Sequence, residues 1–171
     1  YNESEGAAEN NIWPHQSNMI SLNITVDGKR LATYACTSEH SGVNGDVRAG
    51  VGTFCHEFGH VLGLPDLYDT EYKYYSVANW SIMCSGSHTD AGRTPPTYSA
   101  YERFYLGWIK PQQLSEKGQY TLLPLASDNQ AYLIANQQHN MNGKTPSPAE
   151  FFLLEYRQQT GWDTYLPGSG M

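Results

Sequence analysis

Apolar and polar residues alternate near the start of the chain, between residues 20 and 26. Every second side chain there falls on one face, which is the period of a half-buried β-strand. Asp27 and Gly28 follow as a hairpin-type turn, and residues 30–36 then have the pattern of a returning strand. We therefore expect a mixed sheet built from residues 12–36.

A helical period replaces this alternation after a glycine-rich loop at residues 42–52. Apolar side chains then recur at one-, three- and four-residue steps and form a single stripe, made of Phe54, Cys55, Phe58, Val61 and Leu62. Thr53 can cap the start of this helix, Gly63 stands where it should end, and Pro65 prevents its continuation. We expect the stripe to pack beneath the sheet.

The second half of the chain is divided by its prolines and glycines. Residues 66–98 have an irregular pattern, and residues 99–108 predict a short helix that stops near Pro111. Strand-like segments follow at residues 120–125, 131–135 and 151–157. We therefore predict an α+β fold with two parts, a core at residues 1–110 and a β-rich extension at residues 111–171.

Charge and composition exclude several classes of partner. The chain has 171 residues, with 10 lysines and arginines against 17 aspartates and glutamates, and a formal net charge of −7. This balance argues against nucleic acid and anionic membrane surfaces, because both select for basic patches. No run of 18 apolar residues exists that could span a membrane. Charged residues make up only 16% of the chain, which favours a protein that works outside the cell.

The predicted first helix carries the motif His56-Glu57-Phe58-Gly59-His60, or HExxH. Two histidines four positions apart lie about 40° apart around a helix, so both imidazoles project from one face and can bind one metal ion. Neutral imidazole is a good zinc ligand. Zinc lowers the pKa of a bound water, and the neighbouring Glu57 can accept its proton. The motif therefore predicts chemistry that attacks a peptide carbonyl at neutral pH.

The residues after the motif supply a candidate third ligand. The run continues to HExxHxxGxxD and ends on Asp66. By chance, this longer pattern is expected in at most roughly one of twenty thousand chains of this composition. A catalytic zinc site needs a third protein ligand and must leave one position open for water. Gly63 can adopt a left-handed conformation and turn the chain sharply. That turn would bring Asp66 back to the metal.

These residues resemble the metzincin clan of zinc peptidases, whose usual pattern has histidine at the position of Asp66 and a methionine turn further along. Residues 80–86, which include Met83, look like that turn. The resemblance narrows to the immune inhibitor A-type secreted metallopeptidases of bacteria. Their landmarks are similar, in the same order, to residues 12–15, 52–70, 80–83, 106–108 and 161–163.

The resemblance implies a metzincin-like core, with a mixed sheet over the active-site helix, and a secreted bacterial zinc endopeptidase that cleaves an extended peptide or protein. It implies His56, His60 and Asp66 as the zinc ligands, Glu57 as the general base and Met83 beneath the metal. A propeptide and further C-terminal domains are implied for the full-length protein.

Two departures from the family pattern stand out. Ser85 occupies the position at which several metzincins have a tyrosine that stabilises the transition state, so Tyr98 and Tyr101 become the candidates for this role. Only 55 residues precede His56, without a convincing helix, and the chain lacks an initial methionine. We therefore expect a fragment of a longer protein, and one that can be inactive alone.

Two other functions stay open at this point. Glu102 on the second helix could be the third ligand, as in thermolysin-like peptidases, although Gly63 and the methionine turn are then unexplained. The chain could also be a non-catalytic extracellular binding module that keeps a metal for structure, and the intact Glu57 argues against that.

Smaller groups of residues have weaker functional interpretations. Asp69, Glu71 and Asp90 are dense enough to hold calcium, and a solvated acidic loop is the alternative. His15 could approach the metal from a neighbouring strand, although a packed or surface position is favoured. Three cysteines form either one disulfide and a free thiol or, as we favour, three separate thiols at Cys36, Cys55 and Cys84.

Overall fold

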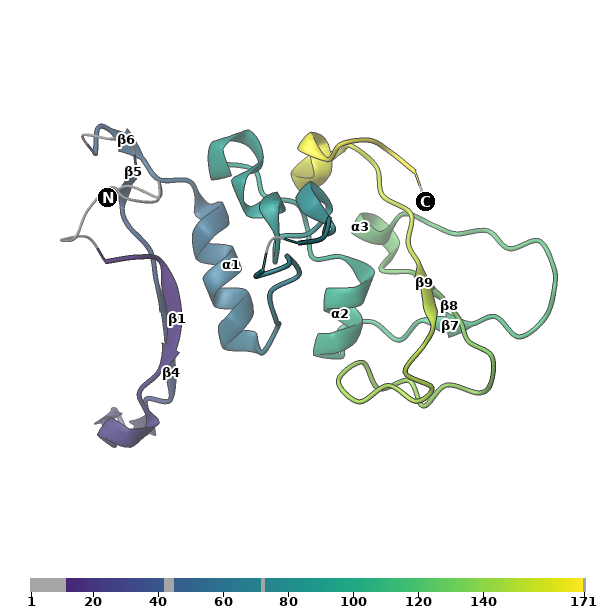
Figure 1. Ribbon diagram of the computed structural model, residues 1–171, viewed down its shortest axis with the longest axis horizontal. Coiled ribbons are helices and arrows are strands. Elements are labelled where there is room, and N and C mark those ends of the chain that lie inside the picture. The colour runs from purple at the N-terminus through teal and green to yellow at the C-terminus, as the bar shows by residue number, and fades with distance from the viewer. Residues whose placement is uncertain (1–11, 42–44, 72, 171) are drawn as a thin grey trace.

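The computed structural model describes residues 12–41, 45–71 and 73–170. Its elements follow one another across the molecule (Figure 1). A ribbon of paired strands comes first, then helices α1 (Val51–Leu62) and α2 (Ala100–Leu106), and finally a small sheet near the C-terminus. Helices and strands both contribute, so the predicted mixture of α and β structure is confirmed at this level.

The N-terminal ribbon is antiparallel. It is formed by β1 (His15–Asn18) and β4 (Thr33–Cys36). A short hairpin of β2 (Thr25–Val26) and β3 (Lys29–Arg30) lies between them in the chain. The hairpin turns at Asp27 and Gly28, which both have positive φ, as the sequence predicts. A third pair, β5 (His40–Ser41) with β6 (Val47–Arg48), precedes α1.

The prediction of one continuous strand at residues 20–26 is wrong. A turn of 3-10 helix at Ile20–Leu22 and a left-handed Asn23 interrupt the segment. Every residue from 20 to 34 is exposed, so the alternating apolar face has no core to pack against. Without burial on one face, alternation alone does not hold a strand together.

Helix α1 begins earlier than predicted and ends where predicted. Its N-cap is Gly50 and not Thr53, which lies inside the helix. The start of the helix approaches residues 85–92 very closely, because a Cβ on Gly52 would lie 1.9 Å from the carbonyl oxygen of Ser87. At the other end Gly63 adopts φ 102°, and its N–H donates to the carbonyls of the preceding turn.

The apolar stripe of α1 does not pack beneath a mixed sheet, so this prediction is also wrong. Helix α1 packs against the two-stranded ribbon β1–β4 (Figure 1) and against residues 85–92. Phe54 and Phe58 remain 43% and 44% exposed. They face the α2 side instead, where they line a groove of about 680 Å³ together with Trp108 and Trp162.

Between α1 and α2 the chain is largely irregular, as predicted, apart from 3-10 helices at Ala78–Trp80 and Ser85–Gly92. Helix α2 begins with a capping box, in which the Ser99 hydroxyl accepts from the Glu102 N–H and the Glu102 carboxylate accepts from the Ser99 N–H. It ends at Gly107, which has positive φ. The prediction of a helix at residues 99–108 is confirmed within the usual uncertainty of helix ends.

The C-terminal part contains the three-stranded sheet. Its strands are β7 (Gln112–Gln113), β8 (Tyr132–Ile134) and β9 (Phe152–Leu154), parallel in the first pair and antiparallel in the second. The predicted strand at residues 120–125 is absent, and helix α3 (Leu125–Asp128) begins after Pro124 instead. Leu125 is fully buried there and belongs to the hydrophobic core. A 3-10 helix at Gly161–Tyr165 follows β9.

One hydrophobic cluster joins the two parts of the chain. Its buried members come from both sides of residue 110 and are Ala100, Phe104, Ile109, Leu125, Ala131 and Leu133. The division at residue 110 stays a prediction, but the two parts share this core. No helix among the described residues is long and apolar enough to cross a membrane.

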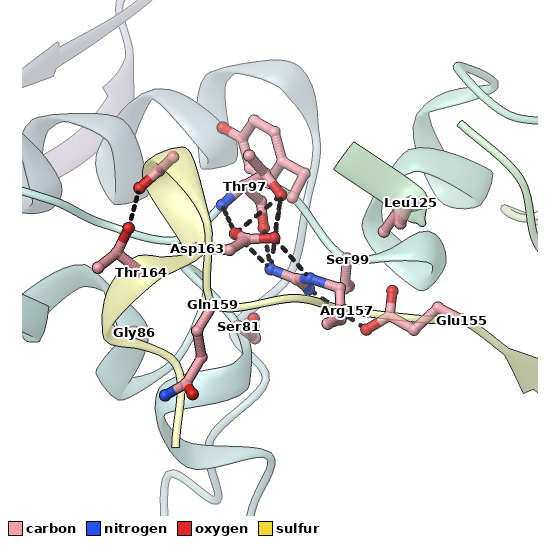
Figure 2. Close-up of polar contacts among 12 residues, drawn as sticks. Ser81, Gly86, Thr97, Ser99, Leu125, Glu155, Arg157, Gln159, Asp163 and Thr164 are labelled. Carbon is pink, nitrogen blue, oxygen red and sulfur yellow. Dashed lines mark hydrogen bonds and ion pairs between the residues drawn. The ribbon is translucent and has the colours of Figure 1, made fainter. Parts of the chain in front are cut away.

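A buried ion pair makes a second connection (Figure 2). The guanidinium of Arg157 donates from Nε and Nη2 to the two carboxylate oxygens of Asp163, at 2.9 and 2.8 Å. Asp163 also accepts from the N–H and hydroxyl of Thr97, at 2.8 and 3.0 Å. Burial disfavours the charged guanidinium, but its bonds to Asp163 and the charge of Glu155 raise the pKa of Arg157. This clasp, Thr97–Arg157–Asp163, fastens the C-terminal segment to the chain just before α2.

Candidate metal centre

The two histidines of the HExxH motif lie one turn apart on the same face of α1. Their rings are perpendicular, with centroids 4.8 Å apart. The Nε2 atoms of His56 and His60 are 3.2 Å apart. The helix therefore aims two imidazole nitrogens at one point, as the i, i+4 spacing predicts.

The turn after α1 brings a carboxylate to the same point. Gly63 reverses the chain, and Asp66 follows three residues later. One carboxylate oxygen of Asp66, Oδ1, lies 3.3 Å from Nε2 of His56 and 3.2 Å from Nε2 of His60. Among the described residues, these three are the one group of histidine, cysteine and acidic side chains that could hold a metal ion.

Main-chain carbonyls set the orientation of both imidazoles. Nδ1 of His56 donates to the carbonyl oxygen of Ile82 at 2.9 Å, and Nδ1 of His60 donates to that of Leu64 at 2.8 Å. A carbonyl oxygen can only accept, so each Nδ1 carries the proton, as assigned from this hydrogen-bond network. In its neutral form each ring then presents the Nε2 lone pair to the point shared with Asp66, which is the form that binds a metal.

The three converging atoms fit a divalent metal and fit poorly without one. With both rings neutral all three atoms are acceptors, and Oδ1 of Asp66 is buried with no hydrogen-bond partner in the described part of the chain. Three lone pairs directed at one point repel each other unless a cation lies between them. Tetrahedral zinc with bonds of about 2.0–2.1 Å would place its ligand atoms about 3.3 Å apart. The observed separations of 3.2, 3.2 and 3.3 Å match that spacing.

Glu57 opens onto the cavity beside these ligands. Its side chain is largely buried, with 9% exposed. A cavity of about 330 Å³ is lined by both Glu57 and His56. Trp13 and Pro14, which directly precede β1, form another part of its wall. A carboxylate and a candidate metal ligand therefore share one space that could admit a substrate.

Met83 lies under the helix and not on the surface. It is fully buried, and a Cβ added to Gly59 would lie 2.4 Å from its sulfur. The absence of a side chain at Gly59 is what lets the thioether approach α1 between the two histidine positions. The carbonyl oxygen of Met83 accepts from the N–H of Leu67 at 2.8 Å, so the turn around Met83 is bonded to the residue next to Asp66.

Glu102 does not join the metal-binding group. Its carboxylate is fully buried and accepts hydrogen bonds from the Ser81 hydroxyl, the Met83 N–H and the Ser99 N–H. All three contacts lie on the side of the methionine turn and the start of α2. The geometry therefore gives no support to Glu102 as a third ligand in a thermolysin-like site.

The two tyrosine candidates also point elsewhere. The Tyr98 hydroxyl donates to the carbonyl oxygen of Cys55 at 3.3 Å, and its ring packs against Trp108. Burial, with smaller contributions from the charges of Cys55 and Glu102, raises the pKa of Tyr98 to about 12. Tyr101 packs against Tyr105, and burial raises its pKa as well. Neither lines the cavity that contains Glu57.

The remaining candidates have structural partners. His15 contacts the Tyr34 hydroxyl at 2.9 Å and the Cys36 sulfur at 3.3 Å, within the ribbon.

The carboxylate of Asp69 accepts backbone N–H groups from its own loop, which lower its pKa. Asp90 is bonded to Arg93 and Thr94. Calcium at these carboxylates stays a prediction. All three cysteines are free thiols.

Tyr68 is a cavity residue that the sequence patterns do not single out. Its ring stacks on that of His56, with centroids 6.4 Å apart and planes at 20°, and it lines the cavity with Glu57. The exposed His88 lines the same cavity. Tyr68 stands only two residues after Asp66, and that proximity to a candidate ligand was the available signal.

Comparisons with known proteins agree with this chemistry. Residues 3–110 match the family model described as "Immune inhibitor A peptidase M6, catalytic domain". The chain is 32% identical over 117 residues to the pre-pro-metalloprotease PrtV of Vibrio cholerae serotype O1 (strain M66-2), covering 61% of this chain and 13% of PrtV. It is 45% identical over 53 residues to immune inhibitor A of Bacillus thuringiensis subsp. alesti, covering 29% of this chain and 8% of that protein. These alignments span only a small part of either relative.

Proposed function

The chain belongs to the immune inhibitor A family of M6 peptidases, whose catalytic-domain model covers residues 3–110, and from this premise we propose that it is the zinc-binding part of an endopeptidase. His56, His60 and Asp66 hold the zinc ion, and Glu57 is the general base. The observation that carries the proposal is the convergence of three atoms, which are Nε2 of His56, Nε2 of His60 and Oδ1 of Asp66. Oδ1 of Asp66 is buried and has no hydrogen-bond partner in the described part of the chain.

The residues divide the reaction between them. When bound, zinc supplies a Lewis acid that lowers the pKa of water and polarises a peptide carbonyl. Glu57 accepts the proton that the attacking water loses and then donates it to the leaving amine. The carbonyls of Ile82 and Leu64 accept from Nδ1 of the two histidines and so select the neutral tautomer whose Nε2 lone pair can bind the metal. Met83 supports the helix from below through its packing against Gly59.

An extended peptide or protein is the proposed substrate. Trp13 and Pro14 line the cavity and lead directly into β1, which has one described partner, β4. A peptide could therefore add to this ribbon through main-chain hydrogen bonds while its scissile bond lies over the cavity. The metzincin-like architecture belongs to this proposal and is supported by the order of α1, Gly63, Asp66 and the turn around Met83.

A secreted bacterial protein with a propeptide is the proposed setting. The two relatives come from bacteria, and one of them is named a pre-pro-metalloprotease. The low share of charged residues, 16%, agrees with a protein that works outside the cell. Further C-terminal domains in the full-length protein are part of the same proposal.

Two substitutions in the full-length protein separate the proposed roles. Glu57→Ala should retain about one zinc per chain and lose peptide hydrolysis by about 10²- to 10⁴-fold, because the water loses its proton acceptor. His60→Ala should lose zinc and hydrolysis together. Zinc content by atomic absorption and cleavage of casein measure the two effects.

Glu116→Gln is the control, because Glu116 is an exposed carboxylate outside the cavity, and it should change neither zinc content nor hydrolysis. Near-normal turnover of Glu57→Ala with zinc bound would contradict the mechanism.

A further inference from the structure

Glu102 is a fully buried carboxylate that does not face the metal-binding point. A buried carboxylate is unfavourable unless hydrogen bonds replace its hydration. Oε1 accepts from the Ser81 hydroxyl at 2.6 Å and from the Met83 N–H at 3.3 Å, and Oε2 accepts from the Ser99 N–H at 2.5 Å. No ion pair to Glu102 is found in the described part of the chain. Its partners are therefore the start of α2 and the turn at residues 81–83.

That turn contacts one of the three candidate ligands and the residue that follows another. The carbonyl oxygen of Ile82 accepts from Nδ1 of His56 at 2.9 Å. The carbonyl oxygen of Met83 accepts from the N–H of Leu67 at 2.8 Å, one residue after Asp66. The turn at residues 81–83 is thus bonded to an imidazole on α1 and to the main chain of the loop that carries Asp66. His60 is held separately, by the carbonyl of Leu64.

We propose that Glu102 is a positioning residue of the metal centre: it holds the turn at residues 81–83, and the turn aims His56 and Asp66. The inference rests on the proposed function, because it assumes that these residues bind zinc. It also explains why α2 begins where it does, since one carboxylate serves the capping box through Oε2 and the turn through Oε1.

The chemistry of the site requires a carboxylate and not merely a side chain of this size. Three donors converge on the two oxygens of Glu102, and glutamine has one carbonyl oxygen and one NH₂ group. In Glu102→Gln the NH₂ group must face either the Ser99 N–H or the pair of donors at Oε1. A donor then meets a donor, and the turn or the helix start must shift.

Zinc affinity of the full-length protein tests the inference without relying on activity. We expect Glu102→Gln to weaken zinc binding by about 10-fold or more, measured by competition with a chromophoric chelator, as for other groups that orient metal ligands. The visible absorption of the cobalt(II)-substituted protein should also shift, because the angle between the ligands changes. Ser81→Ala removes one donor to Glu102 and should have a smaller effect in the same direction.

Asp163→Asn is the matched control, because Asp163 is equally buried in a hydrogen-bond network but does not contact residues 81–83. It should lower thermal stability and leave zinc affinity and the cobalt spectrum unchanged below its melting temperature. Wild-type affinity in Glu102→Gln, or equal losses of affinity in Glu102→Gln and Asp163→Asn, would overturn the inference. If Glu102→Gln does not fold, unchanged affinity and spectrum in Ser81→Ala overturn it. A wild-type protein that binds no zinc overturns the proposed function and, with it, the premise used here.

Discussion

Tyr98 illustrates how burial assigns a role to a single side chain. The sequence makes it a candidate to stabilise a transition state, but its hydroxyl donates to the carbonyl oxygen of Cys55 inside the fold. Burial raises its pKa to about 12. The phenol therefore stays protonated over the whole physiological range and keeps its hydrogen bond inside the fold, and a role for Tyr98 in catalysis stays a prediction.

The raised pKa of Tyr98 predicts a loss of stability at high pH. In the unfolded chain a tyrosine ionises near pH 10, and in the folded protein Tyr98 ionises near pH 12. The contribution of neutral Tyr98 is therefore complete below pH 10 and is lost as the pH rises from about 10 to 12. Denaturant unfolding at several pH values should show a steeper loss for the wild type than for Tyr98→Phe, which has no phenol to ionise. Equal slopes would contradict this account.

At the scale of elements, the sequence predicts best those features that depend on residues close together in the chain. Gly63 ends α1 as predicted, because a glycine that ends a helix acts through only a few neighbouring residues. The strand expected at residues 20–26 fails because burial of its alternating face depends on distant parts of the chain. The start of α1 was missed for a similar reason, since its close approach to residues 85–92 is not encoded in the helix itself.

The candidate site shows the same division. The spacing of HExxHxxGxxD predicts that His56, His60 and Asp66 meet, since one helix and one turn connect all three. Their binding of zinc stays a prediction. The groups that orient them could not be predicted, because the carbonyl of Ile82 is 26 residues away from His56 in sequence and main-chain atoms leave no trace in a residue pattern.

The two glycines that end α1 and α2 allow a matched test of the turn before Asp66. Both have left-handed φ, 102° at Gly63 and 76° at Gly107, and neither position has a close steric neighbour. Alanine should cost about 1–2 kcal/mol of unfolding free energy at either site. Gly63→Ala should also weaken zinc binding by about fivefold or more, because relaxation of the turn displaces Asp66. Gly107→Ala should not. Urea unfolding and chelator competition make the comparison, and equal zinc affinities would contradict it.

At the scale of the whole molecule, the C-terminal segment packs against α2 through a shared hydrophobic core. The shared core contains Phe104 from α2 and Leu125 and Leu133 from beyond residue 110. The Thr97–Arg157–Asp163 clasp adds a polar connection in the interior (Figure 2). Hydrophobic periodicity cannot reveal such a clasp, because charged residues in a sequence pattern normally indicate an exposed surface.

Breaking one side of the clasp should be costly. Asp163→Asn leaves the guanidinium of Arg157, which is 2% exposed, with Glu155 as its remaining ionic partner, at 3.3 Å. We expect a loss of about 3–5 kcal/mol of unfolding free energy, as for other buried ion pairs that lose one member. Replacing both residues by apolar ones, Arg157→Met with Asp163→Leu, should recover most of this loss. Urea unfolding of the three proteins measures it. A double variant less stable than the single one would show that the network matters beyond the pair.

The carbonyl oxygens of Ile82 and Leu64 have a consequence for the way this site can change in evolution. Every amino acid has a main-chain carbonyl, so no replacement of the side chain at either position deletes the acceptor that holds the imidazole proton. Replacement of the side chain at positions 64 and 82 is therefore limited by its volume and burial. Different residues at these positions would leave the same nitrogen of His56 and His60 free to bind the metal. By contrast, a side-chain replacement at Gly63 or at Glu102 is expected to move the backbone that carries these carbonyls or Asp66.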